Sequence, residues 1–241
     1  TTMYDYIIVG AGSAGAPLAT RLAEAGRRVL LLEAGGAGKH PWVNIPLGYG
    51  KVFHDARFNW KYTTKPEPGL NGRQVYWPRG KVLGGSSAIN AMCFVRGHPQ
   101  DFDDWASGGL TEWSYAHCLA YFRKMESYSN GADAYRGGAG PLNVTAPVFS
   151  NPLNEVFLTA AEQAGFQRLA DTNGARQDGF GPVDQTIHQG RRVSTATAYL
   201  TPARRRPNLE IRTSVSVKRI LFEDGRAVGV ECQQNDDVYT V

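Results

Sequence analysis

Residues 4–36 read YDYIIVGAGSAGAPLATRLAEAGRRVLLLEAGG, the pattern of a strand, a glycine loop, a helix and a second strand. The run from Tyr4 to Val9 is apolar and β-branched, which predicts a strand buried on both faces. Apolar residues then recur at helical spacing, at Leu18, Leu22 and Ala23. Gly26 is suited to end that helix, and a second strand is predicted over residues 29–32, closed by Glu33. The stretch therefore predicts a βαβ unit and an α/β fold.

The glycine loop between strand and helix has the spacing of a dinucleotide-binding loop. Gly10 permits a tight turn, Gly12 lets the backbone approach a pyrophosphate, and Gly15 lets helix and strand pack closely. Glu33 lies 18 residues after Gly15, where a carboxylate can accept hydrogen bonds from ribose hydroxyls. The predicted cofactor-binding residues of this unit are Gly10, Gly12, Ser13, Ala14, Gly15, Glu33 and Ala34. The acid disfavours NADP and leaves NAD and FAD open.

A second glycine cluster, GKVLGGSSAIN, occupies residues 80–90. Together with Phe94 and Gly97 it resembles the first signature of the glucose–methanol–choline (GMC) oxidoreductases, which are FAD-dependent enzymes acting mainly on alcohols. Further segments, such as FNWKYTTKPEP at residues 58–68 and GRRVSTATAYLTPARRRPNLEIRT at residues 190–213, are similar to the choline dehydrogenase and bacterial alcohol dehydrogenase branch. The resemblance spans essentially the whole chain and favours FAD over NAD.

This resemblance implies a second set of cofactor-binding residues. The second cluster would offer backbone to the isoalloxazine ring at a place where a Cβ would collide. Residues matching family positions beside the flavin or the adenine are Trp60, Val82, Gly85, Asn90, Ala91, Met92 and Val217. In choline oxidases a histidine of this block can carry a covalent link to the flavin, and Ile89 stands at that position here. We therefore expect FAD to be bound non-covalently.

No catalytic residue is predicted within this chain. Family members are longer, and the histidine-containing pair that they place beside flavin N5 has no counterpart in residues 1–241. None of the five histidines has a metal-ligand or nucleophile pattern, and no metal site is predicted. The loop DTNGARQDG at residues 171–179 superficially suggests a calcium site, but its glycine is at the fourth position, where an EF-hand needs it at the sixth. We therefore expect the general base, and the remaining C-terminal part of the enzyme, to lie outside this segment.

The predicted organisation is a discontinuous FAD-binding Rossmann-like domain with part of an α+β substrate-binding domain. The FAD-binding domain is expected over residues 1–147 and 190–241, and the substrate-binding part over residues 148–189. A capped turn is predicted from Asp101, followed by a helix with Ser114 as its N-cap. A further helix is predicted over residues 151–164, with an apolar stripe of Leu153, Val156, Phe157 and Ala160. Turns are predicted at Asn71-Gly72 and at Asp224-Gly225.

The charge and composition of the chain limit the classes of partner and the cellular location that we expect. The net charge of +4 is dispersed, so a nucleic-acid partner is not expected. No apolar run is long enough to cross a membrane and no signal peptide is recognised, so we expect a cytoplasmic protein, with peripheral membrane association as the alternative. Three cysteines without a metal-type spacing fit a reducing compartment or buried small side chains. A homo-oligomer remains open.

The predicted function is oxidation of an alcohol to an aldehyde or ketone, with hydride passing to flavin N5. Two alternatives stay open. One is an FAD-containing lyase or other non-redox member of the family, and the other is an FAD-binding subunit or fragment without catalysis. The sequence does not name the alcohol, and it does not separate oxidase from dehydrogenase, although the resemblance favours a dehydrogenase.

Overall fold

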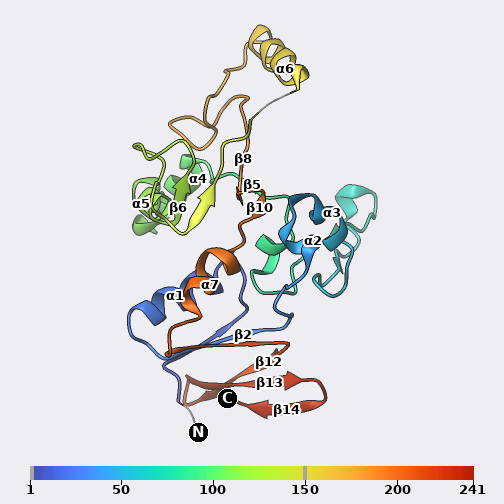
Figure 1. The fold of residues 1–241 in the computed structure, drawn as a ribbon, viewed down its shortest axis with the longest axis vertical. Coiled ribbons are helices and arrows are strands. Elements are labelled where there is room, and N and C mark those ends of the chain that lie inside the picture. Colours follow the sequence, from blue (N-terminus) through green and yellow to red (C-terminus); the bar gives the residue numbers. More distant parts are fainter. Residues whose placement is uncertain (1–2, 149–150) are drawn as a thin grey trace. The chain divides into compact units, whose positions relative to one another are not determined.

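A computed structural model describes residues 3–148 and 151–241 and divides the chain into two compact units (Figure 1). Unit 1 combines the chain up to Ala91 with residues 190–241, and unit 2 comprises Met92–Gln189. The N-terminal and C-terminal parts of the chain thus share one unit. The compact units change at residue 92, whereas we place the start of the substrate-binding part at residue 148. The division into compact units does not show which segment binds the cofactor and which the substrate, so the domain assignment stays a prediction.

The centre of unit 1 is a parallel sheet of three strands. Its order is β1 (Tyr6–Val9), β2 (Val29–Glu33) and β11 (Leu209–Thr213), with β2 in the middle. The register places Leu31 opposite Ile8 on one side and Ile211 on the other. Helix α1 (Gly15–Glu24) connects β1 to β2, which confirms the βαβ unit and the α/β fold.

The two faces of β2 pack against different layers, because successive side chains of a strand point to opposite sides. Val29 and Leu31 lie in a cluster with the helix layer, whose members include Ala16, Ala19, Leu200 and Ala203. Leu30 and Leu32 lie in another cluster with Val215, Val230 and Cys232. The latter cluster involves an antiparallel sheet of β12 (Ser216–Glu223), β13 (Arg226–Gln234) and β14 (Asp237–Thr240). Every residue of β2 is buried.

The end of α1 is as predicted, but parts of the βαβ unit are more exposed than expected. Gly26 has a φ of +80°, and the amides of Gly26 and Arg27 donate to the carbonyls of Ala23 and Leu22 at 3.1 and 3.0 Å. This is a Schellman motif, which needs a glycine at that position. Leu18, however, is 51% exposed, and the helix buries small residues instead. The prediction that β1 is buried on both faces is wrong, since Val9 is 53% exposed and lines the cavity described below.

The remaining elements of unit 1 are short. They are α2 (Pro41–Asn44), α3 (Tyr49–Val52), β3 (Tyr62–Thr63), β4 (Tyr76–Trp77), β10 (Arg191–Arg192), a π-helical turn at Ala196–Leu200, α7 (Thr201–Ala203), and 3-10 turns at Pro46–Gly48, Pro68–Leu70 and Gly85–Ala88. Strands β3 and β4 form an antiparallel hairpin. At the turn of this hairpin, Asn71 and Gly72 both have positive φ, as the Asn-Gly pair predicts. Asp224 and Gly225 also have positive φ, at the turn between β12 and β13.

The described residues of unit 2 form short strands and three helices of eight or more residues. Its strands are β5 (Cys93–Phe94), β6 (Glu126–Tyr128), β7 (Leu142–Val144), β8 (Asp184–Gln185) and β9 (Ile187–His188). Its helices are α4 (Pro99–Ser107), a 3-10 turn at Thr111–Trp113, α5 (Tyr115–Met125) and α6 (Pro152–Gln163). Strands β5 and β8 pair antiparallel, and β6 and β7 pair parallel.

Three helix predictions in unit 2 need correction. The predicted capped turn after Asp101 is the helix α4, whose N-cap His98 and Asp101 form a capping box. Ser114 does precede α5, but its Oγ contacts His117 Nδ1 at 2.7 Å instead of capping the backbone. Helix α6 begins after the N-cap Asn151, close to the predicted start. Its buried residues are Leu158 and Ala161, while Leu153, Val156 and Phe157 of the predicted stripe are exposed. The pattern marked the largest apolar residues, but tertiary neighbours decide which side of a helix is covered.

Unit 2 has a buried ionic network centred on Arg136. Its guanidinium is fully buried and donates to Glu126 Oε1 at 2.7 Å, to Asp171 Oδ1 at 2.7 Å and to Asp184 Oδ2 at 2.8 Å. Glu126 also pairs with Arg96 at 2.6 Å. The Arg136 guanidinium carbon lies 3.5 Å from the centroid of the Tyr128 ring. Burial, followed by the charge of Asp184, raises the pKa of Tyr128 to about 12. The network thus links strands β6 and β8 with the loop at Asp171.

Candidate cofactor site

The first glycine loop is held in shape by contacts within the βαβ unit. Gly10, with a φ of +91°, donates its amide to the carbonyl of Leu32 at 2.7 Å. A Cβ on Gly15 would lie 1.9 Å from the carbonyl oxygen of Gly10. No larger residue fits there, so the close helix–strand packing predicted for Gly15 is confirmed. Ser13 and Ala14 remain exposed just before α1.

The second glycine cluster packs directly against the first loop. The amide of Gly84 donates to the carbonyl of Ala11 at 2.8 Å. Gly85 has a φ of +53°, and a Cβ on it would lie 2.7 Å from the Cα of Gly12. Gly80 is equally constrained, since its Cβ would lie 2.1 Å from the carbonyl oxygen of Gly85. Gly85 is therefore required by the contact between the two loops and Gly80 by the packing within the second cluster, whatever ligand the loops bind.

Glu33 joins the first loop to the segment after β2. One carboxylate oxygen accepts from the amide of Ala11 at 2.9 Å and the other from the amide of Gly35 at 2.8 Å. The side chain is buried. Burial raises the pKa of this carboxyl, while the two amide bonds and the charge of Lys81 act in the opposite direction. Glu33 thus has a structural role that its motif position does not reveal, and the ribose contact stays a prediction.

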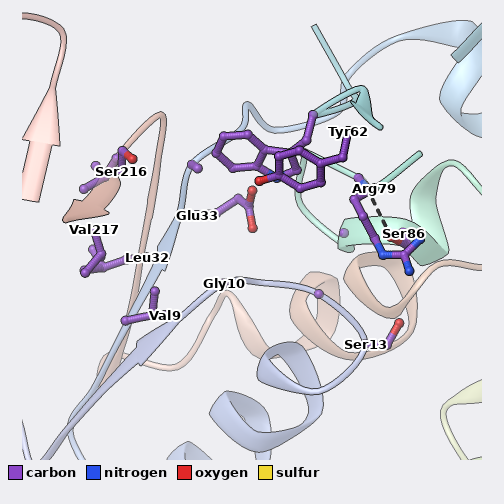
Figure 2. Close-up of a pocket in the computed structure, with 16 residues that line it drawn as sticks. Val9, Gly10, Ser13, Leu32, Glu33, Tyr62, Arg79, Ser86, Ser216 and Val217 are labelled. Atoms are coloured by element: carbon purple, nitrogen blue, oxygen red, sulfur yellow. Dashed lines mark hydrogen bonds between the residues drawn. The ribbon is translucent and has the colours of Figure 1, made fainter. Parts of the chain in front are cut away.

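A cavity of about 510 Å³ opens along both glycine loops (Figure 2). This volume lies within the range of small-molecule and cofactor sites. It brings together eight of the predicted residues, namely Gly10, Gly12, Ser13, Glu33, Ala34, Trp60, Gly85 and Val217. The cavity thus gathers residues from five separate parts of the sequence.

Eight further lining residues were not predicted, and four of them bring an aromatic, charged or hydroxyl side chain to the cavity: Tyr62, Arg79, Ser86 and Ser216. Tyr62 stacks on Trp60, with ring centroids 5.8 Å apart and planes 7° from parallel. Ser86 Oγ accepts from the amide of Gly80 at 3.1 Å. Tyr62 and Ser216 are within two positions of a predicted residue, Ser86 belongs to the second cluster and Arg79 directly precedes it, but no motif marks these side chains.

The other predicted residues do not line this cavity. They are Ala14, Gly15, Val82, Asn90, Ala91 and Met92. The side chain of Val82 is fully buried in a cluster with Val43, Val52, Phe58, Ala88 and Ile89. Met92 is also buried, and Ala91 is exposed. The contacts of these residues with a flavin ring remain predictions, and Val82 could contribute to them with its backbone only.

Arg192 holds the end of the second cluster and was also missed. It is 3% exposed, and its Nη1 donates to the carbonyl oxygen and to Oδ1 of Asn90, at 2.7 and 2.8 Å. Its Nε donates to the carbonyl of Val43 at 2.9 Å. Within the described ranges no carboxylate pairs with it and its Nη2 has no hydrogen-bond partner. Burial lowers the pKa of Arg192 to about 10. From the sequence, the Arg191-Arg192 pair is indistinguishable from two solvated arginines.

In residues 3–148 and 151–241, no three His, Cys, Asp or Glu side chains lie close enough together to hold a metal ion. In the calcium-like loop, Asp171 instead pairs with Arg136. None of the described helices has the length and hydropathy needed to cross a bilayer.

The chain is similar in sequence and in structure to proteins of known family. Residues 4–241 match the family model described as GMC oxidoreductase. The chain is 49% identical over 236 residues to mitochondrial choline dehydrogenase of Mus musculus, covering 95% of this chain and 40% of that protein. It is 47% identical over 240 residues to oxygen-dependent choline dehydrogenase of Vibrio vulnificus, covering 98% and 43%.

Among solved structures, pyridoxine 4-oxidase from Mesorbium loti superposes with a TM-score of 0.94 at 35% identity, over 99% of this chain and 48% of that one. A formate oxidase superposes with a TM-score of 0.86 at 28% identity, over 98% and 43%. The chain therefore spans less than half the length of these relatives. The family model covers nearly all of it, and the chain belongs to the GMC oxidoreductase family.

Proposed function

We propose that the complete protein oxidises an alcohol to an aldehyde or ketone and that the cavity of unit 1 binds FAD. FAD, when bound, supplies the hydride acceptor, N5 of its isoalloxazine ring. The hydroxyl proton goes to a general base that we place outside residues 1–241. The proposal rests on one observation. In a chain that belongs to this family, both glycine loops line the same cavity.

The residues of the cavity suit an adenine dinucleotide. Gly12 leaves the backbone side-chain-free at the entrance to α1, where helix amides favour a phosphate. Glu33 faces the same cavity at the end of β2, and Val9, Leu32 and Val217 supply an apolar wall for a purine. The residues present therefore fit the ADP portion of FAD.

The test of the reaction is anaerobic reduction by an alcohol. We expect the flavin of the complete protein to lose its visible absorbance when choline or a short aliphatic alcohol is added without oxygen. Choline is the first choice because the two curated relatives described above are choline dehydrogenases. Dithionite serves as the control that the flavin can be reduced.

Bleaching by dithionite but by none of these alcohols would reject the proposal and favour the lyase or the non-catalytic alternative. After reduction by an alcohol, reoxidation by air would indicate an oxidase. Reoxidation only by an added quinone or dye would indicate a dehydrogenase, which is the outcome we propose.

We further propose that FAD is held without a covalent bond. Ile89 is fully buried among apolar side chains, and its hydrocarbon side chain has no atom that could bond to a flavin. Acid precipitation of the complete protein should leave the yellow chromophore in the supernatant. A pellet that stays yellow after washing would contradict this.

Two further proposals concern the domain boundaries and the cellular location of the protein. We propose residues 148–189 as part of the substrate-binding domain and the rest of the chain as FAD-binding. We also propose a cytoplasmic location, with peripheral membrane association as the alternative and a homo-oligomer left open. The size of the native protein and its distribution between soluble and membrane fractions of a cell lysate would test these points.

A further inference from the structure

Among the described residues that line the cavity, Arg79 is the one with a cationic side chain. It follows strand β4 and precedes the second glycine cluster. Figure 2 shows its guanidinium on the same side of the cavity as Ser13 and Ser86, beside the loop that begins at Gly10. Val217 and Ser216 lie toward the opposite end. Arg79 is thus placed near the phosphate-binding loop and away from the predicted adenine end.

The charge of Arg79 is not neutralised by the described chain. No ion pair of Arg79 is found in residues 3–148 or 151–241. Its Nη1 donates to the neighbouring carbonyl of Pro78 at 2.8 Å, and its guanidinium carbon lies 4.8 Å from the centroid of the Trp77 ring. Stacking on tryptophan orients an arginine without neutralising it. The exposed edge of the guanidinium therefore keeps its capacity to pair with an anion.

A cation in the cavity would stabilise a bound pyrophosphate. The two phosphates bring negative charge into a space whose other charged lining residue is the carboxyl of Glu33. The glycine loop offers amide dipoles but no charge. Lys81 does not line the cavity, and its Nζ lies 4.7 Å from the centroid of Trp60. A planar guanidinium is well suited to phosphate oxygens, since it can donate two parallel hydrogen bonds.

We propose that Arg79 is a phosphate-binding residue of this cavity and pairs with the pyrophosphate of the bound dinucleotide. This inference rests on the proposed FAD-binding role of the cavity. It adds a charged side chain to a loop that the motif describes only by its glycines, and it gives the Trp77 ring the role of orienting that side chain.

The test measures binding to the complete protein freed of its flavin, with ADP and adenosine as probes. For Arg79→Gln we expect ADP to bind about tenfold more weakly, the loss of one charge-assisted hydrogen-bonded contact. Adenosine binding should not change, because adenosine has no phosphate. Arg79→Lys should lose less than Arg79→Gln, because it keeps the charge. The ADP affinity of the parent should fall with added salt more steeply than that of Arg79→Gln.

Arg73→Gln is the matched control. It removes the same charge from the same hairpin, where Arg73 donates to the carbonyl of Leu70 and does not line the cavity. Its ADP affinity should equal that of the parent. The inference is overturned if Arg79→Gln binds ADP like the parent, if it loses ADP and adenosine equally, or if Arg73→Gln loses as much. If the parent binds neither FAD nor ADP, the proposed function itself fails, and this inference with it.

Discussion

Gly15→Ala is expected to abolish FAD retention by the complete protein and to lower its free energy of unfolding by about 3 kcal/mol or more. The added Cβ would lie 1.9 Å from the carbonyl oxygen of Gly10 and 3.2 Å from Cγ2 of Ile8. A flexible side chain could turn away, but the main obstacle is backbone of the glycine loop itself. Helix α1 would have to move from β1, and the loop that faces the cavity would move with it.

The measurements are the flavin-to-protein absorbance ratio of the purified protein and its unfolding by urea. Gly36→Ala is the matched control, because no atom lies within 4 Å of the Cβ it adds and its φ is not positive. We expect that variant to keep its flavin and its stability. Full flavin content and parent-like stability of Gly15→Ala would show that the loop is more plastic than its packing indicates.

Arg136→Met is the second substitution with a large expected effect, a loss of about 3–5 kcal/mol. Methionine fills much of the space of the arginine but cannot donate hydrogen bonds. Glu126 would still have Arg96, whereas the buried carboxylate of Asp184 would lose its contact with a cation. Removing one partner of a buried ion pair destabilises a protein by more than the intact pair stabilises it, because the remaining charge stays buried and away from water.

This explanation predicts a specific coupling. The double variant Arg136→Met/Asp184→Asn should lose less stability in urea unfolding than the sum of the two single losses, because no unpaired charge remains at position 184. Arg123→Met provides the control on the neighbouring helix α5, where the arginine is exposed, and should change stability by no more than about 0.5 kcal/mol. Strictly additive losses would reject the unpaired carboxylate as the cause.

Local sequence was sufficient to predict the elements whose conformation is decided locally. The βαβ unit, the glycine end of α1 and the turns at Asn71-Gly72 and Asp224-Gly225 depend on residues close together in the chain. Each has its own steric or capping reason. The family resemblance then added the cofactor and the second cluster, which no single local rule contains.

The details that escaped prediction depend on distant residues. Glycine patterns indicated that Gly12 and Gly85 matter, but not that they touch each other across 73 positions of sequence. Glu33 was recognised as an acid at a strand end, while its amide partners depend on how the loops fold back. Arg79 and Arg192 were not predicted because the sequence does not show whether an arginine is exposed, lines a cavity or is buried. Only their neighbours distinguish them.

The central sheet of unit 1 also has a consequence for biosynthesis. Strand β2 is complete once residue 33 has been made, but its partner β11 begins at Leu209. At ribosomal speeds of about 5–20 residues per second, roughly 10–35 s pass between these two points. During that interval the edge of β2 that later pairs with β11 has no native partner, and its run of leucines is a place for mispairing or chaperone binding. We therefore expect the nascent chain to acquire its flavin only after β11 has been added.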